Sequence, residues 1–129
     1  MGNPVVHFEI MGKDAKRLRS FYKDAFDWEV GAPVPGAGDV DYTIVKPIGD
    51  RRPEPPGMSI DGGIGKAPEG YDGHVTFYVA VDDADAALRK IESLGGKKMM
   101  GPDKVPNGPT IALFQDPEGH TVGVVEVDG

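Results

Sequence analysis

A strand followed directly by an amphipathic helix occurs twice in this chain, and this repeat constrains the fold more than any other feature. The first copy alternates apolar and polar residues from Val5 to Ile10 and reaches a helix-capping residue at Asp14. The second copy begins at Val75 and ends near Met99. Two copies of one unit in a short chain predict a duplicated fold with a cavity between the copies.

Each expected helix has one apolar face and defined ends. In the first helix, apolar residues recur at helical spacing up to Phe26, and Asp27 tolerates the turn conformation that ends the helix. In the second helix, Asp82 or Asp83 caps the start and Gly95-Gly96 marks the end. The expected strands cover 4–11, 41–48, 58–64, 74–81, 97–100, 110–115 and 120–127, with another starting at 28 and loops at 31–40, 49–57, 66–72 and 101–108.

The order of these elements is βαβββ, twice. We therefore predict an α+β fold in which two βαβββ modules form an open, U-shaped, mostly antiparallel eight-stranded sheet, with the helices on the outside. The chain is expected to be a single domain over residues 1–129, with module one at about 4–65 and module two at about 73–127.

Alternation assigns a face to each residue of the two strands that lead into the helices. The residues expected under the helices are Val6, Phe8, Ile10, Phe77, Val79 and Val81. The opposite faces, which carry His7, Glu9, Thr76 and Tyr78, are expected to line the interior. Burying polar groups without partners is costly, so we expect a wet or ligand-filled cleft there.

Composition limits the classes of function. A chain of 129 residues is long enough to bury the core of one domain, and the absence of cysteine excludes disulfides, thiolate metal sites and a cysteine nucleophile. The net charge of -7 and the lack of a basic stripe argue against a nucleic-acid partner. No segment reaches the roughly 18–20 apolar residues of a membrane span, and no signal peptide is visible, so we expect no membrane partner and a cytoplasmic protein.

Four segments of the chain carry motifs that are specific in combination. They cover residues 7–10, 21–29, 78–88 with the following Gly95-Gly96, and 114–120. Together they resemble the glyoxalase/bleomycin-resistance/dioxygenase family, also called the vicinal oxygen chelate superfamily, over almost the whole chain. The resemblance implies a single glyoxalase-like domain with paired modules, a U-shaped cavity for a small-molecule ligand, and a homodimer.

The resemblance also implies where a metal would be held, and only one of four ligand positions keeps a strong ligand. The histidine of the first strand falls on His7. Its partner position falls on Thr76, the carboxylate of the last strand falls on Gly123, and the remaining position falls near Gly62-Gly63. Catalytic metal sites typically keep about three protein ligands, so we predict no cofactor. A divalent metal, held through His7, is the alternative.

A metal could also be held by ligands at positions other than those the resemblance implies. His74 lies two residues before Thr76 and therefore on the same face of the strand, and Glu9 shares a face with His7. Two imidazoles and one carboxylate suit a divalent transition metal.

The leading hypothesis is a glyoxalase-like protein that binds a small organic molecule without the usual tight metal site. The candidate catalytic residues are His7 and Glu9, as general base and orienting acid, and the candidate ligand contacts are Thr76, Tyr78 and His74. One alternative is a metal-dependent lyase, isomerase or dioxygenase with the rearranged ligands. The other is a drug- or metabolite-sequestering protein without catalysis, so enzyme status stays open at this point.

Overall fold

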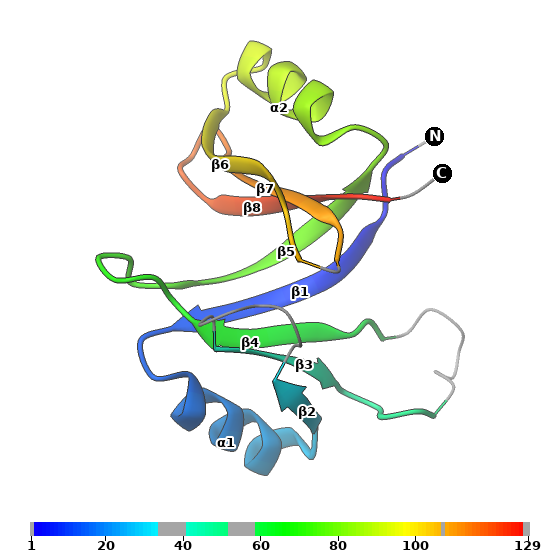
Figure 1. Cartoon of the computed structure of the whole chain (residues 1–129), viewed down its shortest axis with the longest axis vertical. Coiled ribbons are helices and arrows are strands. Elements are labelled where there is room, and N and C mark those ends of the chain that lie inside the picture. The colour runs from blue at the N-terminus through cyan, green and yellow to red at the C-terminus, as the bar shows by residue number, and fades with distance from the viewer. Residues whose placement is uncertain (1, 34–40, 52–58, 107, 128–129) are drawn as a thin grey trace. The chain divides into compact units, whose positions relative to one another are not determined.

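The computed structural model describes residues 2–33, 41–51, 59–106 and 108–127. These residues form eight strands and two helices in the predicted order, βαβββ twice, which confirms the α+β class (Figure 1). The elements are β1 (Val5–Gly12), α1 (Ala15–Phe26), β2 (Glu29–Pro33), β3 (Tyr42–Lys46), β4 (Gly62–Lys66), β5 (His74–Val81), α2 (Ala84–Ser93), β6 (Lys97–Lys104), β7 (Thr110–Gln115) and β8 (Thr121–Glu126).

The described residues divide into two compact units. One is the 7–75 unit; the other, called the 76–129 unit below, also contains residues 1–6. Strands follow the order β2-β3-β4-β1 in the 7–75 unit and β5-β8-β7-β6 in the 76–129 unit. In each unit the strand that leads into the helix pairs in parallel with the last strand, and the other pairs are antiparallel. The predicted mostly antiparallel pairing is therefore confirmed.

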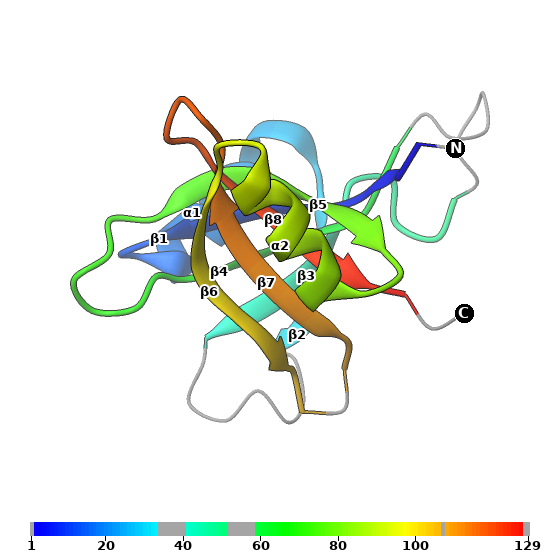
Figure 2. The ribbon, with the colours of Figure 1, turned by 90° about the horizontal axis from the view of Figure 1, so that it is seen from above.

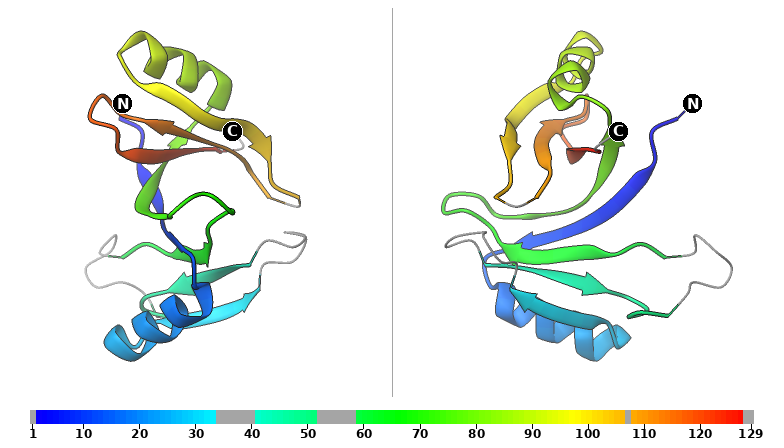
Figure 3. Two further views of the ribbon diagram at one scale, coloured as in Figure 1. Left: turned by 90° about the vertical axis from the view of Figure 1, so that its left-hand side faces the viewer. Right: turned by 45° about the vertical axis from the view of Figure 1, so that its right-hand side comes forward.

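The core of the 7–75 unit lies between α1 and its sheet. Ile10, Val45 and Ile64 are buried at its centre. Trp28 closes one end, with its ring stacked on that of Tyr22 at a centroid distance of 5.3 Å. Helix α1 packs against β4 and β2, and both views of Figure 3 show it alongside these strands. The apolar stripe read from the sequence is thus the face that covers the sheet.

The core of the 76–129 unit lies between α2 and the strands β6, β7 and β8, across which the helix runs in Figure 2. Leu88 of α2 is 2% exposed and packs with Val81 and Val124. At the start of the helix, the carboxylate of Glu126 accepts a hydrogen bond from the backbone N–H of Ala84 at 3.0 Å. A carboxylate in this position stabilises the helix N-terminus.

The helix ends follow the sequence signals. The carboxylate of Asp14 accepts a hydrogen bond from the Arg17 N–H, and that of Asp83 accepts one from the Ala86 N–H. Asp27 adopts the left-handed conformation, at φ 58° and ψ 31°, directly after α1. Both N-caps and the turn residue at the end of α1 are therefore confirmed.

One expectation about faces and three about bounds are wrong. Val6 and Phe77, expected under the helices, are 40% and 42% exposed, because α1 packs on β4 and β2, and α2 packs on β6, β7 and β8, rather than on the starts of β1 and β5. The strand expected over 58–64 lies at Gly62–Lys66, since its glycines fit against aromatic rings. The strand expected to stop at 100 continues to Lys104. The loop expected at 31–40 starts later, because β2 extends to Pro33 in its pairing with β3. Residues 34–40, residues 52–57 of the loop expected at 49–57, and the first residue of the 58–64 strand lie outside the described residues.

Among the described residues, neither helix has the length and apolar character needed to cross a bilayer.

Replacing Leu88 by Ala should lower the free energy of unfolding by about 2–5 kcal/mol, because the smaller side chain leaves a cavity under α2. The matched control is Leu94→Ala directly after the same helix, where Leu94 is 69% exposed and the expected change is within about 0.5 kcal/mol. Urea denaturation followed by circular dichroism measures both values. Equal losses for the two variants would contradict the assigned core.

Candidate functional site

A buried carboxylate and two ring side chains form a continuous hydrogen-bonded network in the 7–75 unit. His74 Nε2 lies 2.6 Å from Glu9 Oε2, and both side chains are 9% exposed. On the other side of the imidazole, His74 Nδ1 lies 2.7 Å from the hydroxyl oxygen of Tyr71. Both ring nitrogens of His74 are therefore held by protein groups.

The backbone of residues 67–73 brings Tyr71 and His74 to β1. The N–H of Ala67 donates to the carbonyl of Gly12, and the N–H of Tyr71 donates to the carbonyl of Pro68 in a turn. Gly73 has φ +109°, and a Cβ there would lie 2.1 Å from the carbonyl oxygen of Met11. Only glycine allows this close approach, which places the next residue, His74, beside Glu9.

His7 makes a second contact with a tyrosine in the same unit. Its Nε2 lies 2.8 Å from the hydroxyl oxygen of Tyr42 on β3. Burial lowers the pKa of His7 below its ordinary value of 6.5, and the carboxylates of Glu9 and Asp61 oppose this shift without cancelling it. The structure therefore favours a neutral imidazole, a form that suits a general base.

The other two predicted ligand contacts belong to the 76–129 unit. Thr76 is buried, and its hydroxyl donates to the backbone carbonyl of Thr121 at 2.6 Å. Tyr78 is 5% exposed and stands opposite Gly123 in the register of β5 and β8. Within the 7–75 unit, the structure brings Glu9 and His74 together directly.

The positions that the resemblance assigns to metal ligands do not fit a metal. At Gly63, which pairs with Glu9, a Cβ would lie 1.9 Å from the Tyr42 hydroxyl. At Gly123, a Cβ would lie 2.5 Å from the ring of Tyr78. Side chains long enough to be ligands are therefore excluded from both positions unless the tyrosines move.

The rearranged ligand set is not assembled either. Residues 2–33, 41–51, 59–106 and 108–127 contain no group of three His, Asp or Glu side chains placed to hold a metal ion. The Nε2 atoms of His7 and His74 face Tyr42 and Glu9 respectively. We therefore derive no chemical step through a metal.

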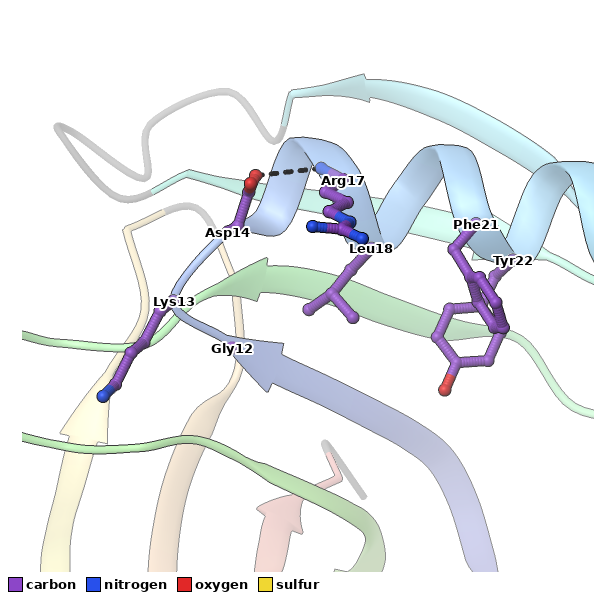
Figure 4. Close-up of a pocket in the computed structure, with 7 residues that line it drawn as sticks. All are labelled: Gly12, Lys13, Asp14, Arg17, Leu18, Phe21 and Tyr22. Atoms are coloured by element: carbon purple, nitrogen blue, oxygen red, sulfur yellow. Dashed lines mark hydrogen bonds between the residues drawn. The ribbon is translucent and has the colours of Figure 1, made fainter.

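A surface hollow of about 400 Å³ lies along α1 (Figure 4). The residues that line it differ from those in the histidine and tyrosine contacts described above. Its lining from the helix comes from positions three and four residues apart, which share one face. None of the predicted site residues lines this hollow. The lining residues are Gly12, Lys13, Asp14, Arg17, Leu18, Phe21 and Tyr22.

Sequence reasoning missed two tyrosines. Tyr42 alternates with Thr43 and Val45, which are buried, so it lies on the face opposite the core. Tyr71 lies three residues before His74 in a segment read only as a connector. The turn signal at Pro68 was the one local hint that Tyr71 folds back toward the strand.

The fold and the motifs together define the class of protein. The chain matches the Glyoxalase/Bleomycin resistance protein/Dioxygenase superfamily over residues 5–124 and belongs to this superfamily. It is 31% identical over 121 residues to the protein CFP32 of Mycobacterium tuberculosis, and the match covers 90% of this chain and 42% of the relative. It is 31% identical over 124 residues to the anthracycline biosynthesis protein DnrV of Streptomyces peucetius, covering 91% and 44%. The chain thus spans less than half the length of these curated relatives.

Solved structures share the fold at low identity. Methylmalonyl-CoA epimerase from Mycobacterium tuberculosis has a TM-score of 0.64 at 14% identity, over 97% of this chain and 88% of that chain. A glyoxalase/bleomycin resistance protein/dioxygenase superfamily member from Vibrio splendidus 12B01 has a TM-score of 0.59 at 15% identity, over 98% and 100%. At these identities the likeness shows the fold alone.

The lowered pKa of His7 predicts a pH dependence of stability. Below the ordinary pKa of 6.5 the unfolded chain takes up a proton at His7 that the folded chain resists, so acid destabilises the fold. From about pH 7.5 to about pH 5.5, the free energy of unfolding should fall more steeply for the wild type than for His7→Gln. Urea denaturation at several pH values measures the difference, and equal slopes would contradict it. The other two histidines are present in both proteins and cancel in the comparison.

Proposed function

We propose that the protein binds a small organic molecule and performs proton transfer on it without a resident metal ion. In this proposal His7 is the general base, Glu9 orients His74, and His74 contacts the ligand through its ring. Thr76 and Tyr78, which belong to the 76–129 unit, remain predicted ligand contacts. The reaction class is acid–base chemistry of the lyase or isomerase kind, with the imidazole supplying the base.

The buried pair of Glu9 and His74 is the observation that supports this proposal most. Both side chains are 9% exposed, and burying a carboxylate beside an imidazole costs free energy that an apolar pair would not. Pairs of this kind that persist in a fold are candidates for functional groups. The neutral state favoured for His7 adds a base in the same unit.

We further propose that the protein acts as a homodimer in the cytoplasm, as superfamily membership and the composition suggested. Sedimentation velocity of the untagged protein at several concentrations tests the first part: a concentration-independent dimer supports it, and a monomer throughout contradicts it.

Binding of small molecules should be independent of metal and dependent on His7. Ligand-observed NMR with a panel of small carboxylic acids and ketones should detect a binder whose affinity falls at least about tenfold in His7→Ala, a loss of about 1.4 kcal/mol. EDTA should leave the affinity unchanged. The matched control is His120→Ala, because the His120 side chain is 73% exposed and bonds to Asp116 in the β7–β8 turn.

Metal analysis of protein purified without an affinity tag completes the test. Substoichiometric nickel, zinc, iron and manganese are the expected result. A stoichiometric metal that is lost in His7→Ala would contradict the metal-free part of the proposal. Binding without proton exchange at any bound probe would contradict the proton-transfer part and favour a sequestering protein.

A further inference from the structure

We propose that Glu9, His74 and Tyr71 form a nucleophilic triad in which the phenol oxygen of Tyr71 accepts an acyl group from an activated ester. The proposal shares the Glu9–His74 pair with the proposed function, but it needs neither His7 nor the ligand contacts of the 76–129 unit. It assigns a role to Tyr71, which the proposed function leaves unused.

The three groups are hydrogen-bonded in the series that a nucleophilic triad requires: the Tyr71 hydroxyl as nucleophile, His74 as base and Glu9 as the orienting carboxylate. The distances are 2.7 Å from the Tyr71 oxygen to His74 Nδ1 and 2.6 Å from His74 Nε2 to Glu9 Oε2. In the proposed arrangement Nε2–H of His74 donates to the carboxylate of Glu9. Nδ1 is then an acceptor for the Tyr71 O–H.

Tyr71 lies in the connector of residues 67–73 and is partly exposed, as the residue His74 is. The side chains of Glu9 and His74 are 9% exposed. The Pro68–Tyr71 turn and the close approach of Gly73 to β1 hold the connector in place. The rings of Tyr71 and His74 meet edge to face, with centroids 5.6 Å apart. This packing holds the phenol oxygen of Tyr71 with a base at hydrogen-bonding distance.

The reaction balances without any further reagent. As the Tyr71 oxygen forms a bond to the acyl carbon, its proton passes to His74 Nδ1, while Nε2–H continues to donate to Glu9. The bond from the acyl carbon to the leaving oxygen then breaks, and the leaving group takes the proton from Nδ1. The products are an O-acyl tyrosine and a free phenol or alcohol. Glu9 stabilises the imidazolium that forms between the two steps.

The experiment uses 4-nitrophenyl acetate with the full chain. We expect a burst of nitrophenol equal to the protein concentration, and peptide mapping by mass spectrometry should locate the acetyl group on Tyr71 among the four tyrosines. Tyr71→Phe should abolish the burst, and His74→Gln should slow it by about 10²-fold or more, as loss of a general base does. His120→Gln is the matched control for background reaction at an exposed histidine and should leave the burst rate unchanged.

A second readout is independent of reagent access. In ¹⁵N NMR spectra of the histidine side chains, His74 should show a protonated Nε2 and an unprotonated Nδ1, and Tyr71→Phe should shift the Nδ1 resonance. Tyr71→Phe removes one oxygen atom from a half-buried ring, so it tests the proposal without altering the buried Glu9–His74 pair.

Acetyl groups confined to lysines or to other tyrosines would overturn the proposal, as would a burst that survives His74→Gln in folded protein. These outcomes leave the proposed function intact, because His7-dependent binding is measured separately. Loss of binding with a normal burst would overturn the proposed function and leave the triad standing.

Discussion

An aromatic ring lying over a glycine of the neighbouring strand is the contact on which both parallel strand pairs depend. A Cβ at Gly62 would lie 2.5 Å from the ring of Phe8, and a Cβ at Gly123 would lie 2.5 Å from the ring of Tyr78. The β1–β4 and β5–β8 pairs therefore require glycine at these points. At residue 123, the same packing removes the carboxylate that the family's metal-using members place there. One steric constraint thus shapes both sheets and leaves no space for a side-chain ligand at residue 123 unless Tyr78 moves.

The two repeats have the same order of elements but carry different residues at equivalent strand positions. β1 and β5 each have eight residues and lead to an aspartate N-cap, so Glu9 and Tyr78 take the same place in their strands. In β5 this place holds a ring over glycine, whereas in β1 it holds the carboxylate that meets His74. The repeat supplies the scaffold, and a difference at one strand position places the buried Glu9–His74 pair in the 7–75 unit.

The sequence predicted the parts of the fold that depend on local patterns. Helix caps and the order of elements follow from spacing within a few residues, and the structure has them. The start of β4 was missed because a glycine pair lowers strand propensity, while the rings that compensate come from β1 and β3. Tyr71 was missed for a similar reason. Its contact with His74 depends on the backbone of Gly73 passing close to Met11. The alternation of apolar and polar residues along the sequence does not indicate such a close approach.

A tyrosine hydroxyl lies within hydrogen-bonding distance of a ring nitrogen of His7 and of a ring nitrogen of His74. His7 Nε2 lies 2.8 Å from the Tyr42 oxygen, and His74 Nδ1 lies 2.7 Å from the Tyr71 oxygen. A phenol can donate to an unprotonated ring nitrogen or accept from a ring N–H, so it pairs with either tautomer of a neutral imidazole without adding charge. Protonating His7 leaves only N–H donors on its ring, so the Tyr42 oxygen must then act as the acceptor, and burial opposes the new charge as well. The tyrosine hydroxyls therefore orient both imidazoles without adding charge.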